Sequence, residues 1–147
     1  LNCVAKVARE FVPKSHEKYK IFQALAFLHD TLEDTEIKEE DILKESSLEV
    51  LNLVKLLTDK PGKNRKERHL NTYFLIRDSE DAVMGKLFDR IANIRYSLSS
   101  KNEEKGSMYL KESHGFKLAL YDGRHKKAQK VWKAYDKEVV KLLDFLK

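Results

Sequence analysis

The chain has 147 residues, of which 41% are hydrophobic and 36% are charged, and its formal net charge is +5. This length and apolar content suit one domain with a single core. A single cysteine excludes an internal disulfide framework, and no apolar run approaches the roughly 18 residues of a membrane span. We therefore expect a cytoplasmic protein that does not associate with membranes.

Helices are expected throughout the chain. Only five glycines and two prolines are available for tight turns, whereas Leu, Lys, Glu and Ala are abundant. The sequence thus predicts an all-α fold of about seven or more helices, in one domain over 1–147. Because the chain begins with Leu, we also expect a short N-terminal segment to be missing from it.

The first half of the chain contains three predicted helices. Residues 3–12 form a short apolar helix that Pro13 ends, because a residue before proline is displaced from the α region. Apolar residues then recur every three or four positions over 18–34, which predicts one central helix with a buried face. Ser46, followed three residues later by Glu49, predicts a capping box that starts a helix over 48–58.

The second half begins after the clearest loop of the chain, at residues 59–62. Helical spacing resumes over 63–76 with a basic first half, and Ser79 is expected to start a helix that runs to 99. A polar stretch over 99–107 separates that helix from two last helical segments, at about 107–121 and 125–146. Asp122 and Gly123 divide these two segments.

Residues 27–35 read FLHDTLEDT and place a histidine and several acids on an otherwise apolar helix. On a continuous helix, His29 and Asp30 would point inward at neighbouring angles, offering nitrogen and oxygen ligands to a divalent ion. Glu33 and Asp34 would follow one turn later. The alternative interpretation is a hydrogen-bonded core histidine followed by a solvated helix end.

A second polar cluster lies on the predicted helix over 79–99. One face of this helix is apolar, and the opposite face carries Lys86, Asp89, Asn93 and Tyr96, with Arg90 at its edge. A short Asp among Asn, Arg and Lys is typical of a ligand surrounded by groups that bind phosphate. An ordinary exposed face is the alternative.

FLHDTLEDT together with KLFDRIANIR at 86–95 resembles the HD-domain phosphohydrolases. The resemblance is to the hydrolase domain of RelA/SpoT-type proteins and their small stand-alone relatives, whose signatures read approximately ALLHDxxEDT and KLADRxxNxR. The stretch LTDKPGKNRKER also resembles the basic loop and helix of the small members. The resemblance implies a compact HD-domain helical bundle.

The resemblance implies a role for each matching residue. His29, Asp30 and Asp89 would bind one divalent ion, usually manganese in this family, and Glu33 or Asp34 would deprotonate the attacking water. The implied nucleotide-facing and phosphate-facing residues are Asn93, Lys86, Arg90, Tyr96, Lys60, Arg65 and Arg68. The start of the helix containing Arg65 and Arg68 could equally be an ordinary exposed basic surface.

The sequence departs from the family at one metal ligand. The family has a further histidine ahead of its first helix, and no histidine precedes the matching LNCVAKVA. His16 is the only histidine upstream of His29, and it is expected in a loop after Pro13, in the wrong register. His69 has no acidic or histidine partner at a metal-binding spacing and is expected to lie at the surface or in helix packing.

The implied activity is hydrolysis of guanosine tetra- or pentaphosphate (ppGpp or pppGpp) at the 3′ position, giving GDP or GTP and pyrophosphate, as in the stringent response. Alternatives within the family are a nucleotidase, an NADPH 2′-phosphatase or a degenerate domain that binds nucleotide without turnover. A basic nucleic-acid-binding module is a further alternative, with Lys/Arg clusters at 60–68 and 124–133 and with Trp132 and Tyr135 to stack on bases. The spacing of Trp132 and Tyr135 favours core positions instead, so a nucleic-acid partner is not expected.

Overall fold

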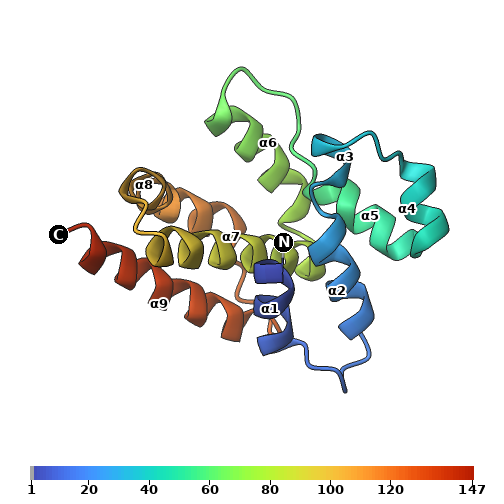
Figure 1. Ribbon diagram of the computed structural model, residues 1–147, viewed down its shortest axis with the longest axis horizontal. Helices are drawn as coiled ribbons and strands as arrows, with labels where there is room; N and C mark the ends of the chain where they lie inside the picture. The colour runs from blue at the N-terminus through green and yellow to red at the C-terminus, as the bar shows by residue number, and fades with distance from the viewer. Residues whose placement is uncertain (1) are drawn as a thin grey trace.

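The computed structural model describes residues 2–147, except for the side chains of Asn2 and Asp34 (Figure 1). Over this range the chain forms nine helices and no strand, which confirms the prediction of an all-α fold. The helices are α1 (Asn2–Phe11), α2 (Tyr19–Leu28), α3 (Thr31–Asp34), α4 (Glu39–Glu45), α5 (Leu48–Leu57), α6 (Arg65–Ile76), α7 (Glu80–Ser99), α8 (Glu103–Leu120) and α9 (Gln129–Phe145).

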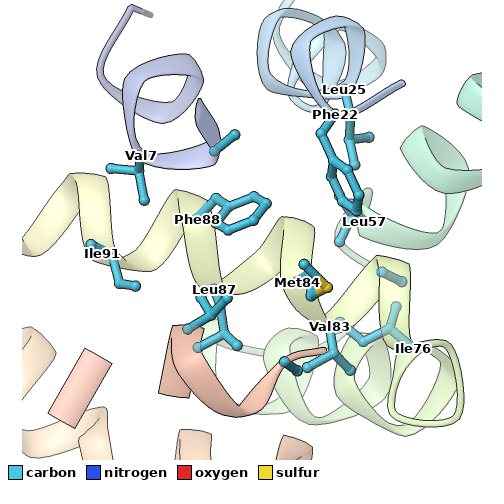
Figure 2. Close-up of a cluster of buried hydrophobic side chains, with 14 of the residues drawn as sticks. Val7, Phe22, Leu25, Leu57, Ile76, Val83, Met84, Leu87, Phe88 and Ile91 are labelled. Atoms are coloured by element: carbon cyan, nitrogen blue, oxygen red, sulfur yellow. The ribbon is translucent and has the colours of Figure 1, made fainter. Parts of the chain in front are cut away.

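Helix α7 is the axis of the fold. It packs against α1, α2, α5, α8 and α9, and Figure 1 shows it running between them. Its predicted apolar face is buried, with Val83, Leu87 and Ile91 fully enclosed. Figure 2 shows Phe88 of α7 between Val7 of α1 and Phe22 of α2, in the same buried cluster. The polar face of α7 is thereby fixed opposite the core.

Polar side chains cap several of the helices. Ser79 accepts a hydrogen bond from the backbone N–H of Ala82, which confirms the predicted start of α7. The predicted cap at Ser46 is wrong by one residue, because Ser47 caps α5 by accepting from Val50 N. Ser46 instead ends α4, a helix that the sequence did not predict, and its hydroxyl donates to the Ile42 carbonyl.

Two further boundaries differ from the prediction. Helix α8 begins at Glu103, inside the stretch that we expected to be a polar connection, because Asn102 accepts from Lys105 N and caps it. Lys101 has a φ of 54°, and this left-handed residue turns the chain directly from α7 into α8. Helix α9 begins at Gln129, four residues later than expected. Over 2–147 no helix is long and apolar enough to span a bilayer.

Two helical glycines should respond in opposite ways to a larger side chain. A Cβ on Gly115 meets nothing within 4 Å, so Gly115→Ala is expected to raise the free energy of unfolding by roughly 0.5–1 kcal/mol. A Cβ on Gly85 would lie 2.9 Å from Leu25 Cδ2 and 3.1 Å from Leu57 Cδ1. Gly85→Val should therefore lower that free energy by about 1–3 kcal/mol. Urea denaturation measures both changes, and equal changes for the two variants would contradict this packing.

Candidate functional site

The helix is interrupted at the histidine and aspartate of FLHDTLEDT. The predicted continuous helix over 18–34 is wrong here, because α2 ends at Leu28 and His29 is its C-cap, while Asp30 precedes α3. The Thr31 hydroxyl donates to the Leu28 carbonyl at 2.7 Å, which satisfies one of the carbonyls left free at the end of α2. This break sets the directions of His29 and Asp30, which a helical projection could not give.

The structure brings the three predicted metal ligands together. His29 Nε2 lies 3.0 Å from Asp30 Oδ2 and 3.2 Å from Asp89 Oδ1, although Asp89 is 59 positions away from Asp30 on α7. The His29 side chain is only 12% exposed. Asn93, one turn after Asp89 on α7, donates from Nδ2 to Asp89 Oδ1 at 3.2 Å and so helps to orient that carboxylate.

The hydrogen bonds of His29 fix the roles of its two nitrogens. Nδ1 lies 3.0 Å from the Ala26 carbonyl, which can only accept, so Nδ1 carries a hydrogen. Nε2 therefore faces the two carboxylates with either a second proton or a free lone pair. Burial lowers the pKa of His29, but the hydrogen bonds with Asp30 and Asp89 outweigh burial and raise the pKa from 6.5 to about 10.

The chemistry of these donor atoms fits a divalent cation. Metal-bound histidines commonly donate their other ring N–H to a backbone carbonyl, as His29 does to Ala26. Adjacent ligand atoms around an octahedral ion with bonds of about 2.1 Å lie about 3.0 Å apart. The described residues nevertheless contain no group of three or more His, Cys, Asp or Glu already arranged around a common ion position. In the geometry described, the imidazole and the carboxylates are directed at one another.

These residues open into a cavity of about 210 Å³ between the end of α2 and helices α6, α7 and α8. Five further predicted site residues lie in its wall. The lining comprises His29, Asp30, Glu33, Leu57, Asp59, Arg65, His69, Gly85, Lys86, Asp89, Arg90, Asn93 and Tyr109. Polar groups predicted from two distant motifs thus share one cavity.

Three predicted substrate-binding residues do not line the cavity. Tyr96 is 65% exposed on the same helix, further from its start. Lys60 directs its ammonium group to the carbonyls of Lys55 and Thr58, at 2.7 Å each. Arg68 is absent from the lining, and only Arg65 of the basic segment reaches it. The side chain of Asp34, the second predicted catalytic acid, lies outside the described part of the structure.

His16 takes no part in this cavity. It lies in the loop between α1 and α2, where its Nδ1 accepts a hydrogen bond from the backbone N–H of Lys18 at 3.0 Å. The expectation of a loop position is confirmed.

Arg90 is a structural residue of the cavity wall, and its predicted place on an open polar face is wrong. It is 3% exposed, and it donates to Glu112 Oε1 and to the Tyr73 hydroxyl, both at 3.1 Å. Its guanidinium also lies over the Phe116 ring at 4.6 Å. Because α8 supplies Glu112 and Phe116, it encloses Arg90, which periodicity along α7 could not predict.

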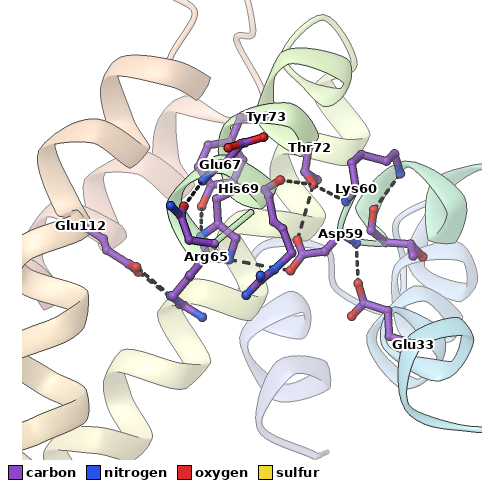
Figure 3. A network of polar contacts seen from close by, with 12 residues as sticks. Glu33, Asp59, Lys60, Arg65, Glu67, His69, Thr72, Tyr73 and Glu112 are labelled. Atoms are coloured by element: carbon purple, nitrogen blue, oxygen red, sulfur yellow. Dashed lines mark hydrogen bonds and ion pairs between the residues drawn. The ribbon is translucent and has the colours of Figure 1, made fainter. Parts of the chain in front are cut away.

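Glu112 is shared by two arginines. Arg65 Nε donates to Glu112 Oε2 at 2.7 Å (Figure 3), and Arg65 Nη2 shares Oε1 with Arg90 at 3.2 Å. Burial raises the pKa of Glu112, but the hydrogen bond from Arg65 and the charge of Arg90 outweigh it and hold the pKa below its ordinary value. The carboxylate therefore stays ionised and holds both arginines at the cavity.

Glu33 is tied to the loop after α5. Its Oε1 accepts a hydrogen bond from the Asp59 backbone N–H, as Figure 3 shows. Burial raises the pKa of Glu33 above its ordinary value, although this hydrogen bond opposes the change. A carboxylate with a raised pKa is better matched to accepting a proton near neutral pH.

His69 is a cavity residue that the sequence interpretation missed. It is buried, in agreement with the expectation of helix packing, and its Nε2 lies 3.8 Å from Asp59 Oδ2, a residue outside its own helix. The sequence offered only a weak signal, because Asp59 and His69 belong to different elements. Asp59 and Tyr109, which also line the cavity, were likewise missed, as was Glu112, which binds Arg65 and Arg90.

The contacts of Tyr73 determine the tautomer of His69. Arg90 donates to the Tyr73 oxygen, so the single hydroxyl hydrogen of Tyr73 is available for His69 Nδ1, which lies 3.3 Å away. Nδ1 then accepts, and Nε2 carries the hydrogen of the neutral ring. Burial, with the charges of Arg65 and Lys86, lowers the pKa of His69 from 6.5 to about 4. His69 thus presents a neutral N–H donor on the side of Asp59.

The two histidines should give the metal-free protein a stability maximum near pH 6.5. The pKa of His29 is raised on folding, so its contribution to stability is present below pH 6.5 and is lost as the pH rises towards about 10. The pKa of His69 is lowered, so stability is lost as the pH falls from 6.5 towards about 4. We expect His29→Gln to flatten the alkaline limb and His69→Gln the acid limb of unfolding free energy measured with chelator present. An unchanged profile in both variants would contradict these assignments.

Comparison with family models, curated proteins and solved structures found no match to this chain. The resemblance to HD-domain phosphohydrolases therefore rests on the sequence motifs alone.

Proposed function

We propose that this protein is a metal-dependent phosphohydrolase that acts on nucleotides. The observation that supports it most is the meeting of His29 Nε2 with the carboxylates of Asp30 and Asp89 inside a cavity that also contains Glu33. The resemblance of the two motifs to HD-domain enzymes agrees with this reaction class. The proposed place of action is the cytoplasm.

His29, Asp30 and Asp89 would hold the cation, with manganese as the proposed ion. When bound, such an ion polarises a phosphoryl oxygen and lowers the pKa of its water towards about 7. Glu33 lines the same cavity and would accept the proton from the attacking water, a contribution of typically 10²–10⁴ in rate. Asp34 is the second candidate for this role.

Arg65 and Lys86 are the proposed phosphate-binding cations. Both line the cavity, and Arg65 is 42% exposed although it is bound to Glu112. Charge-assisted hydrogen bonds from such groups would neutralise the charge on a leaving diphosphate. Asn93 is proposed to face the nucleotide while it orients Asp89.

His69 is proposed to donate a hydrogen bond from Nε2 to a phosphoryl oxygen. A neutral donor in a buried wall stabilises developing negative charge and cannot be deprotonated near pH 7. His69→Phe should lower kcat/KM by about 10²-fold, the lower end of the effect of losing one oxyanion donor. His69→Gln, which keeps a donor, should recover part of the loss. Steady-state kinetics measures both, and equal activity of His69→Phe and the parent would exclude the role.

The proposed substrate is guanosine tetra- or pentaphosphate, cleaved to GDP or GTP and pyrophosphate. The test is a nucleotide panel that includes guanosine tetraphosphate, nucleoside monophosphates and NADPH, incubated with the protein and manganese. Phosphate and pyrophosphate are measured separately. We expect manganese-dependent pyrophosphate release from guanosine tetraphosphate. Phosphate release from another nucleotide would assign a nucleotidase or an NADPH phosphatase, and binding without product would identify a nucleotide-binding domain that lacks turnover.

A further inference from the structure

The positive charge of the protein is concentrated in one groove between α1 and α9. Two adjoining hollows, which share Phe11 and Lys130, run along α9 from the loop before it to Lys141. We call them together the α9 groove. Eight Lys or Arg residues and three acids line it, and their net charge of +5 equals the formal net charge of the whole chain. The charges elsewhere therefore cancel.

The three acids of the α9 groove are already paired within the protein. Asp81 pairs with Lys18 at 2.5 Å, Glu10 with Arg95 at 2.6 Å, and Glu138 with Arg95 and Lys141 at 3.2 and 3.1 Å. Five other lysines have no ion-pair partner among the side chains that the structure describes, namely Lys126, Lys127, Lys130, Lys133 and Lys137. Their ammonium groups remain available to an external anion.

The distribution of charged residues along α9 destabilises this helix. Its first turn contains no acidic residue and its last turn no basic one, whereas a helix is stabilised by the opposite distribution. Lys130, Lys133 and Lys137 also follow one another at three- and four-residue spacing, where like charges repel. Helices α7 and α8 both begin with two acids, as the helix dipole favours. A partner that supplies negative charge would relieve this repulsion.

We propose that the α9 groove binds the phosphate backbone of a nucleic acid. Successive lysines rise about 4.5–6 Å along α9, and a nucleic-acid strand offers a phosphate every 3.4 Å or so of axis, so several pairs can form at once. Trp132 and Tyr135 are 2% and 1% exposed, which confirms the core positions that their spacing favoured and leaves no ring to stack on bases there. Recognition is therefore electrostatic and independent of base sequence.

The lining of the groove favours a nucleic acid over a membrane surface. An interfacial helix needs exposed apolar side chains to enter the lipid. None of the large exposed apolar residues described over 2–147 lines the groove. The groove also shares no lining residue with the candidate active-site cavity, so this inference stands apart from the proposed hydrolysis.

The test is fluorescence anisotropy with a labelled 20-nucleotide RNA of mixed sequence, titrated at several salt concentrations. With about five phosphate contacts, the slope of log K against log salt should be about −3.5. The variant Lys130→Gln/Lys133→Gln/Lys137→Gln should bind at least tenfold more weakly at 50 mM salt or so, with a slope near −1.4. A thermal melt by circular dichroism checks that it remains folded.

The matched control removes three exposed lysines that lie outside the groove, at positions 20, 44 and 105. It lowers the net charge equally, so an affinity close to that of the parent supports a localised site. An equal loss in both triple variants overturns it, because binding would then follow overall charge. Absence of salt-dependent RNA binding, or preferential binding to phosphatidylserine vesicles or polyglutamate, also overturns the assignment to nucleic acid.

Discussion

Asp89→Ala is expected to lower kcat/KM for the hydrolysed nucleotide at least 10³-fold in the presence of manganese. Asp89 is the only one of the three proposed ligands that comes from α7, and its Oδ1 lies 3.2 Å from His29 Nε2. Loss of this ligand would remove a Lewis-acid contribution of several kcal/mol, and each 1.4 kcal/mol or so corresponds to a tenfold change in rate. Steady-state release of phosphate or pyrophosphate measures the effect.

Two companion variants separate chemistry from folding. Asp89→Asn keeps the shape of the side chain and should be nearly as inactive, because a neutral amide is a poor ligand for a divalent ion. Asp78→Ala removes an exposed acid outside the cavity and should retain the parent rate. If folded Asp89→Ala turns over substrate at the parent rate, the site is assigned to the wrong residues.

Arg90→Met is expected to lower the free energy of unfolding by about 3 kcal/mol, the lower end of the cost of breaking a buried ion pair. The side chain of Arg90 is 4% exposed in its pair with Glu112. The substitution would leave Glu112 with Arg65 alone and remove the donor to the Tyr73 hydroxyl. Urea denaturation at fixed pH measures the change.

The control for Arg90 is an arginine in an exposed pair. The side chain of Arg124 is 83% exposed beside Asp122, and Arg124→Met should leave the unfolding free energy close to that of the parent. Arg90→Lys keeps the charge but not the planar fork and should recover only part of the loss. A cost for Arg90→Met no larger than that of the control would show that this buried network does not stabilise the fold.

The fold could be predicted where local chemistry determines it. The apolar periodicity of α7 gave its buried face, and Ser79 gave its first turn. Prediction of the α5 N-cap failed because two neighbouring residues are of the same type. Ser46 and Ser47 can both cap a helix, and the unpredicted α4, which has Ser46 as its C-cap, leaves Ser47 to cap α5.

The candidate site could be predicted in part for the same reason. The two motifs gave His29, Asp30 and Asp89, which the structure brings within hydrogen-bonding distance. The orientation of His29 and Asp30 depends on where α2 ends. A helical projection that treats 18–34 as one continuous helix does not include this end. The predicted convergence therefore arises from a different local structure than the one expected.

The remaining cavity residues depend on contacts between distant elements. Arg90 is enclosed because α8 supplies Glu112, and His69 gains Asp59 from the loop before α6. Neither pairing has a signature in sequence spacing. Lys60, by contrast, was predicted to bind substrate but does not line the cavity. Its ammonium group donates to the nearby carbonyls of Lys55 and Thr58 instead.

Binding of one divalent ion by His29, Asp30 and Asp89 can be measured directly with manganese. Titration of the metal-free protein with Mn²⁺, followed by the loss of the free-ion electron paramagnetic resonance signal, should show one ion per chain. Glu33→Gln should retain this ion, since Glu33 is assigned to proton transfer, and Asp89→Ala should lose it. Binding of Mn²⁺ with unchanged affinity in Asp89→Ala, or no binding by the parent protein, would contradict the account.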